Sequence, residues 1–281
     1  RSISEAKMSI KNILITHSGS AGFPSGVGHA TKIAAKHDAW LTAVYGSTSS
    51  YFEHVLGLTE DLLDKLGNVR NEKIEAARAF FEEQASAAGV AERSRFVMPN
   101  EIGKLRLPEI ARNFDFVVTG YHSNLPTDEF RAVNPDLMAL QSGRPVLVVP
   151  NGYSTDKLGS HALVAWDGKR SAARALNDAM TILEERPRKV TILIVGASLP
   201  KMPEGTDIVT HLRRHGVDVE QVERPKGKNG IADVIQRTAA ELGAKLIVMG
   251  AYEHSKFSQD LFGGVTHEVI RSSQVPVFMS H

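Results

Sequence analysis

Glycines stand at both ends of a loop near the C-terminus, between residues 244 and 281. The apolar residues 246–249 predict a buried strand that ends at Gly250. Gly263 and Gly264 then precede an amphipathic helix predicted over residues 265–273. Glycine allows a ligand to approach the backbone closely, and the free N–H groups of a helix start attract phosphate. This arrangement predicts a phosphate site.

The same order of elements occurs once before, in residues 114–150. An apolar strand again ends at a glycine, Gly120, and a loop, a short helix, Pro145 and a final strand follow. The beginnings of the two halves, residues 12–20 and 162–169, also match. We therefore predict a duplication, with domains spanning residues 8–152 and 160–281. Each is of ordinary domain size, and the polar residues 151–160 link them.

Strands and helices alternate in both halves, and the predicted strands are apolar throughout. This pattern predicts an α/β fold with parallel sheets covered on both faces. In the first half, residues 18–28 read as a glycine-rich loop, 27–38 as a helix, 46–67 as an insertion forming a small helical flap, and 68–88 as a long helix.

The last strands of the two halves, residues 145–149 and 275–279, are predicted to meet. A bare edge strand invites association, and both strands carry proline near the start, where a sheet tolerates it. Pairing of like halves predicts an intramolecular pseudo-dimer with pseudo-twofold symmetry.

Composition excludes several classes of function. The 281 residues contain 42% hydrophobic and 23% charged residues, which is ordinary for a globular protein. A net charge of +1 gives no general attraction to nucleic acid or to an anionic membrane. The chain has no cysteine, so it has no disulfide or thiolate chemistry. We expect a cytoplasmic protein without nucleic-acid or membrane partners. Residues 1–7, which precede Met8, read as a vector remnant.

From Met8 onward the chain resembles the universal stress protein family in its tandem form. Nucleotide-binding members carry Gly-x2-Gly-x9-Gly followed by Ser or Thr after the fourth strand, with an aspartate after the first strand. Here Gly250 and Gly263 match, whereas Glu253 stands at the second glycine and Gly264 at the hydroxyl position. The resemblance implies two doubly wound, five-stranded parallel-sheet domains of the adenine nucleotide hydrolase-like fold, with ligand at the crevice where strand order reverses.

The resemblance also implies adenine nucleotide as the ligand, namely ATP with or without Mg²⁺, in the C-terminal half. Asp167 would hold the ribose hydroxyls or magnesium, and Val195 would contact adenine. Backbone groups at the glycines would meet the phosphates. The implied cofactor-binding residues are Ala165, Asp167, Val195, Gly250, Glu253, Gly263, Gly264, Val265 and Thr266. Glu253 opposes phosphate binding by charge, and Gly264 lacks the hydroxyl ligand.

The N-terminal half departs further from the motif. Ser18 stands in place of the aspartate, and Ser123 follows Gly120 where a glycine belongs. A nucleotide site is therefore predicted only in the C-terminal half. The loop 18–28 fits neither GxGxxG nor GxxxxGK[ST], which favours a connection over a phosphate loop.

Three functions compete at this level. The first is a stress-response regulator that binds ATP, with no assigned catalytic residue and at most slow hydrolysis. The second is a nucleotide-independent scaffold of the same fold, in which a second chain adds to the pair as a homodimer. The third is an enzyme or a metal protein. A serine hydrolase would carry its nucleophile in a GxSxG elbow, and neither His17 with Ser18 nor His122 with Ser123 lies in such a motif. The set Glu253, His254 and His267 matches no compact metal motif.

Overall fold

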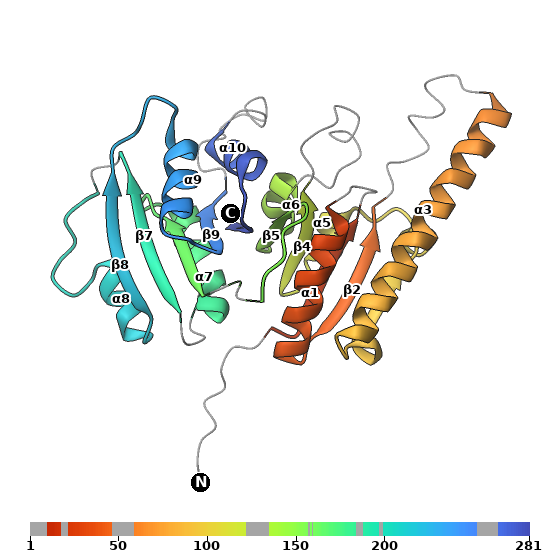
Figure 1. The fold of residues 1–281 in the computed structure, drawn as a ribbon, viewed down its shortest axis with the longest axis horizontal. Coiled ribbons are helices and arrows are strands. Elements are labelled where there is room, and N and C mark those ends of the chain that lie inside the picture. The colour runs from red at the N-terminus through yellow and green to blue at the C-terminus, as the bar shows by residue number, and fades with distance from the viewer. Residues whose placement is uncertain are drawn as a thin grey trace, which may run out of the picture.

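The computed structural model describes residues 10–17, 22–46, 59–121, 135–156, 158, 160–183, 188–196, 199–251 and 264–281. Their strands form one ten-stranded sheet in the order β3-β2-β1-β4-β5-β10-β9-β6-β7-β8 (Figure 1). Within each half all neighbouring strands are parallel. No helix among these residues has the length and apolar character needed to cross a membrane.

The first half supplies one edge of this sheet. Its elements are β1 (Asn12–His17), α1 (Phe23–His37), β2 (Trp40–Tyr45), α3 (Glu60–Ala87), the 3-10 turn Ala91–Arg93, β3 (Ser94–Val97), α4 (Pro99–Ile102), α5 (Leu107–Ala111), β4 (Phe116–Tyr121), α6 (Pro135–Ser142) and β5 (Val146–Pro150).

The second half has the same order of strands and supplies the other edge. Its elements are β6 (His161–Ala165), α7 (Arg170–Leu183), β7 (Lys189–Val195), α8 (Ile208–Arg214), β8 (Asp218–Arg224), α9 (Ile231–Glu241), β9 (Leu246–Gly250), α10 (Val265–Ser272) and β10 (Val277–Ser280).

The two halves join through their last strands, as the sequence predicted. β5 and β10 pair antiparallel, with Leu147 opposite Phe278, while every pair inside each half is parallel. The same strand order read outward from this junction gives the molecule its pseudo-twofold symmetry. The prolines before both strands use their carbonyl groups in equivalent ways: Pro145 accepts a hydrogen bond from Val117, and Pro276 from Ile247.

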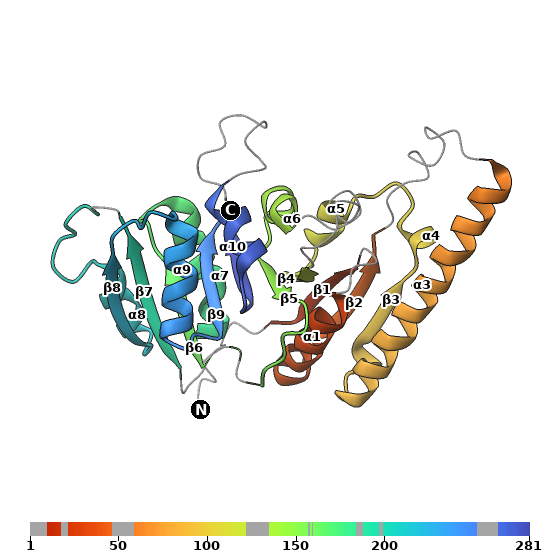
Figure 2. The same ribbon diagram turned by 45° about the horizontal axis from the view of Figure 1, so that its top comes forward.

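Two apolar cores lie on opposite faces of the sheet. One contains buried residues of α1, α3, α7 and α8, and the other contains residues of α5, α6, α9 and α10. The turned view shows the two helical layers on either side of the strands (Figure 2). Because both faces are covered, strand residues on both sides are buried, which explains their unbroken apolar runs. The doubly wound α/β fold predicted from the sequence is confirmed.

Two predicted boundaries are wrong. Helix α1 begins at Phe23, inside the predicted loop. Pro24 lies in its first turn, where a backbone N–H has no partner within the helix, so proline is well tolerated there. Helix α3 begins at Glu60, so the end of the predicted flap is helical. Thr59 precedes it in extended backbone, and Glu60 and Asp61 give an acidic first turn suited to the helix dipole. Residues 47–58 of the flap lie outside the described residues.

Candidate functional site

The candidate site lies at the carboxyl ends of β6, β7 and β9. β6 is the central strand of the three, and Ala165 is level with Leu193 of β7 and Met249 of β9. The chain leaves β6 through α7 toward β7, and it reaches β9 from α9 on the opposite face. Strand order therefore reverses beside β6, and such a point leaves a crevice beyond the carboxyl ends of the strands. Ala165 and Val195, both half-buried, end their strands at this edge.

Asp167 lies in the turn between β6 and α7, with 47% of its side chain exposed. Its carboxylate accepts a hydrogen bond from the Lys169 backbone N–H at 3.1 Å, and the Lys169 Nζ lies 3.8 Å away. Gly168 takes a positive φ of 74° in this turn, which favours glycine. The turn fixes the direction of the carboxylate while leaving it accessible, as a ligand for hydroxyl groups or a cation must be.

Gly250 packs against a helix backbone. A Cβ added there would lie 2.6 Å from the backbone N of Ala172 in the first turn of α7. The N-terminal half repeats this contact, because a Cβ on Gly120 would overlap the carbonyl group of Gly22 before α1. Gly26, one turn into α1, is similarly close, with its Cβ position 3.2 Å from the Gly120 N. The glycine at the end of the fourth strand thus serves packing in both halves, whatever else it does.

Gly264 is the N-cap residue of α10 and therefore stands at the start of that helix. It has φ −86° and ψ 168°, an ordinary extended conformation, and a Cβ there would meet open space. Its carbonyl accepts the first helical bond from Glu268. Val265 is half-buried and Thr266 is buried. Because α10 follows a parallel strand, its first turn lies at the same edge as Asp167.

Loops that sequence reasoning did not assign to the site also reach this edge. After β7, Gly196 has φ 62°, and its Cβ position is 2.9 Å from the Lys226 Cβ that follows β8. The side chain of Leu199 lies over the turn at Gly168, 3.2 Å from that Cβ position. The only sequence signal was their place after an apolar strand, and that does not reveal which loops meet.

Several predicted residues lie outside the described residues. They are Glu253, Gly263 and His254. The described part of the chain contains no cluster of three or more His, Asp or Glu side chains that could hold a metal ion. His267, of the weighed metal set, is half-buried in the first turn of α10.

The corresponding edge of the N-terminal half is filled by aromatic rings. His17 ends β1, and its ring stacks on Phe23 with centroids 3.8 Å apart and meets the edge of Tyr45 at 5.0 Å. All three residues are buried. Burial lowers the pKa of His17 to about 4, so the ring is neutral at pH 7. Helix α6 also begins with Pro135, which has no N–H. The end of β1 is therefore packed with side chains, and Ser18, the counterpart of Asp167, lies outside the described residues.

These features define a tandem α/β protein whose second half has a candidate site where strand order reverses. Residues 160–281 match the sequence model of the universal stress protein family. The chain therefore contains a universal stress protein domain, and its overall arrangement is the tandem form of that fold. No curated protein sequence gives a significant match.

Solved structures share this tandem arrangement. A universal stress protein from Archaeoglobus fulgidus DSM 4304 matches with 19% identity and a TM-score of 0.74, over 96% of each chain. A protein of unknown function from Pseudomonas aeruginosa PAO1 has 17% identity and a TM-score of 0.51, covering 99% of this chain and 94% of its own. At these identities the likeness concerns the fold.

Proposed function

We propose that the C-terminal half binds an adenine nucleotide, ATP with or without Mg²⁺, and that the protein acts as a nucleotide-linked stress regulator. The observation that carries this proposal is the accessible carboxylate of Asp167, held by its own turn at the switch point. A carboxylate there accepts hydrogen bonds from ribose hydroxyls, or it ligates magnesium through oxygen.

The start of α10 supports the second part of this site. Gly264 has no side chain that could cap the first turn of α10, and a helix start favours an anion. Lys169, with its Nζ near Asp167, adds a cation at the same edge. These groups fit the polar ends of a nucleotide, with Val195 offering apolar surface for the base.

Two sequence departures predict weak binding. Glu253 adds a carboxylate beside the phosphate position of the motif, and Gly264 lacks the hydroxyl that family members use. No residue of the site stands out in the sequence as a general base. We therefore propose binding as the function, with hydrolysis slow at most.

The second candidate is a scaffold that needs no nucleotide. The contact of Gly250 with α7 favours it, because packing alone accounts for that glycine. The continuous sheet through β5 and β10 also gives the two halves a structural reason to be paired.

Nucleotide content separates these candidates. Protein purified under mild conditions is denatured, and the supernatant is analysed by ion-exchange chromatography for adenine nucleotides. Titration calorimetry with Mg-ATP then compares the parent with Asp167→Ala. We expect Asp167→Ala to weaken binding about tenfold, the loss typical of one charged hydrogen bond.

Two matched controls complete the titration. Asp218→Ala removes an exposed carboxylate at the opposite edge of the sheet, where the strands begin and Asp218 of β8 is level with Lys189 of β7. Ser18→Ala changes the corresponding position of the other half. Both should bind Mg-ATP like the parent. Equal losses in all variants, or no binding by a protein that contains no nucleotide, would favour the scaffold.

A further inference from the structure

Helix α3 is much longer than the fold requires. It contains 28 residues, whereas α8, its counterpart between the second and third strands of the other half, contains 7. The buried residues of α3 begin only at Ile74 and continue with Ala77, Phe81 and Ala85. From Glu60 to Lys73 no residue is buried. In both views the first half of α3 runs past the ends of the strands (Figures 1 and 2).

The first half of α3 nevertheless carries an apolar stripe. Leu62, Leu66 and Val69 are 42%, 38% and 49% exposed, and they are half of the large apolar residues exposed among the described residues. Their spacing of four and three residues places them on one side of the helix. At about 100° per residue, this side is roughly a quarter turn from the side on which Ile74, Ala77 and Phe81 meet the core. The stripe is therefore separate from the sheet-facing surface.

We infer that this stripe is a docking surface for a second copy of the chain, with the two α3 helices antiparallel. Leu62, Leu66, Val69 and Lys73 follow the alternating three- and four-residue steps of a coiled-coil seam. In an antiparallel pair Leu62 packs on the methylene groups of the other copy's Lys73, and Leu66 packs on its Val69. The seam is symmetric, as a twofold contact requires.

Charge selects the antiparallel direction. Lys65 and Glu72 flank the seam on the same side, each one residue before a core position. Antiparallel helices bring Lys65 beside Glu72 of the second copy, and symmetry creates this pair twice. Parallel helices would instead bring Lys65 beside Arg70 of the second copy and place the two Lys73 side chains together. Like charges at these positions oppose association.

The contact is short and therefore weak. Residues 62–73 span about 18 Å of helix, far less than a standard interface covers. Lys65 also leaves part of an existing exposed ion pair with Asp61, at 2.7 Å, which is worth little. We expect dissociation constants of about 10 µM to 1 mM, so the dimer forms only at high local concentration.

Sedimentation velocity from about 5 µM to about 1 mM protein tests the surface, since that range brackets a weak interface. The parent should sediment increasingly as a dimer, and Leu66→Gln should remain monomeric. Leu105→Gln, which changes an apolar residue of 59% exposure outside α3, is the matched control and should behave as the parent. Equal circular dichroism spectra and melting temperatures show that the variants are folded. A parent that stays monomeric, or a dimer indifferent to Leu66→Gln, overturns the inference.

Exchanging the charges of Lys65 and Glu72 tests whether the two α3 helices pair antiparallel. Lys65→Glu and Glu72→Lys should each weaken the dimer about threefold or more, and the double exchange should restore it. In a parallel dimer Lys65→Glu would strengthen association, because it would face Arg70 of the second copy. Strengthening by Lys65→Glu, or a double exchange no better than the single ones, overturns the antiparallel arrangement.

Discussion

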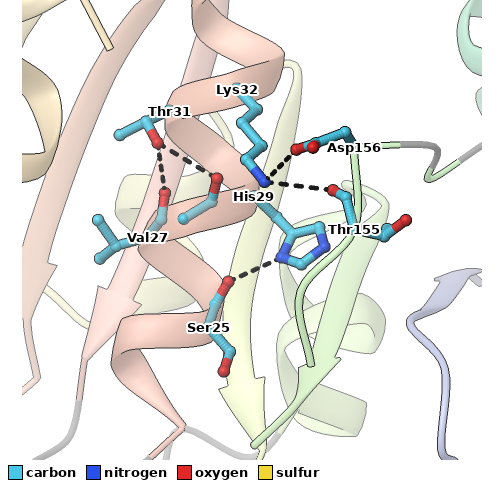
Figure 3. A network of polar contacts seen from close by, with 8 residues as sticks. Ser25, Val27, His29, Thr31, Lys32, Thr155 and Asp156 are labelled. Atoms are coloured by element: carbon cyan, nitrogen blue, oxygen red, sulfur yellow. Dashed lines mark hydrogen bonds and ion pairs between the residues drawn. The ribbon is translucent and has the colours of Figure 1, made fainter. Parts of the chain in front are cut away.

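The ring of Tyr153 lies against the imidazole of His29, with centroids 5.6 Å apart and planes inclined by 25°. Tyr153 belongs to the segment after β5 that leads to the second half, and His29 lies in α1. The same segment is held at both sides of this contact. The Gly152 N–H donates to the Ser25 Oγ at 2.9 Å. The Lys32 Nζ lies 2.6 Å from the Asp156 carboxylate (Figure 3). The connection between the halves is thus fastened along α1.

We expect the ring contact to stabilise this connection more than the ion pair does. Tyr153→Ala should lower the free energy of unfolding by about 1–2 kcal/mol, because it removes half-buried aromatic surface. Asp156→Ala should change it by less than about 0.5 kcal/mol, because the Asp156 side chain is 88% exposed. Urea denaturation of both variants checks this order. A larger loss for Asp156→Ala would show that the ion pair is the principal fastening.

Acid should destabilise the protein through its buried histidines. Burial lowers the pKa of His17 to about 4, below the 6.5 of the unfolded chain. The unfolded state therefore binds a proton first as pH falls, so the stability contribution is complete above about pH 6.5 and is lost from there down to about pH 4. At pH 5 the loss from His17 is on the order of 2 kcal/mol.

The measurement is the free energy of unfolding in urea at pH 7 and pH 5. His17→Gln should reduce the difference between the two pH values, whatever its effect on stability at pH 7. An unchanged difference in His17→Gln would contradict the assignment of this acid sensitivity to His17. Burial also lowers the pKa of His29, whose Nδ1 faces the Ser25 carbonyl at 2.9 Å and whose Nε2 has no hydrogen-bond partner among the described residues. Part of the loss of unfolding free energy between pH 7 and pH 5 should therefore remain in His17→Gln.

Much of the fold could be predicted from sequence because burial on both faces makes each strand apolar. β4 and β9 are recognisable for that reason, and so is the duplication. The meeting of β5 and β10 followed from edge strands that need a partner. The length of α3 was not predicted, because the apolar residues of its first turns lie on a different side of the helix from those that meet the core. The start of α1 was missed because Gly22 and Gly26 resemble a loop, although they allow the helix to lie against Gly120.

The candidate site was predictable at the ends of strands and not beyond them. Asp167 and Gly264 follow directly from element order, since parallel strands end at one edge. The approach of Lys226 to Gly196 depends on how two loops curve, which no local pattern determines. Gly250 was predicted as a ligand contact, and the structure adds a packing reason that sequence could not distinguish from it.

Replacement of Gly250 should therefore affect stability, independently of any ligand. Gly250→Ala places a methyl group against the backbone of α7 and should cost about 2–4 kcal/mol of unfolding free energy without nucleotide. Thermal melts measured without nucleotide check this prediction. Gly143→Ala is not a suitable control, because Gly143 has φ 65°. Gly28→Ala is suitable, because Gly28 lies in α1 and its Cβ would meet open space, and it should be neutral or stabilising.

A serine at the start of α10 should increase both the stability of the protein and its affinity for Mg-ATP. Gly264→Ser has room for its side chain, and φ −86° suits a serine N-cap. Its hydroxyl can accept a hydrogen bond from the first turn, which should raise stability by a few tenths of a kcal/mol relative to glycine. It also restores the hydroxyl of the family motif, so Mg-ATP should bind several-fold more tightly. Gly264→Ala separates the two effects, since it should gain neither. Tighter binding by Gly264→Ala would show that the hydroxyl is not the ligand.

Glu253 offers the sharpest test of the phosphate position. Glu253→Gly removes a carboxylate and restores the glycine of the motif. Loss of one like charge beside a partly solvated phosphate is worth on the order of 1 kcal/mol, so Mg-ATP should bind several-fold more tightly. The gain should be larger for ATP than for adenosine, which has no phosphate, and salt should narrow it by screening. Calorimetric titrations of both ligands at low and high salt measure this. Weaker ATP binding by Glu253→Gly, or an equal gain for adenosine, would contradict a phosphate cradle beside this residue.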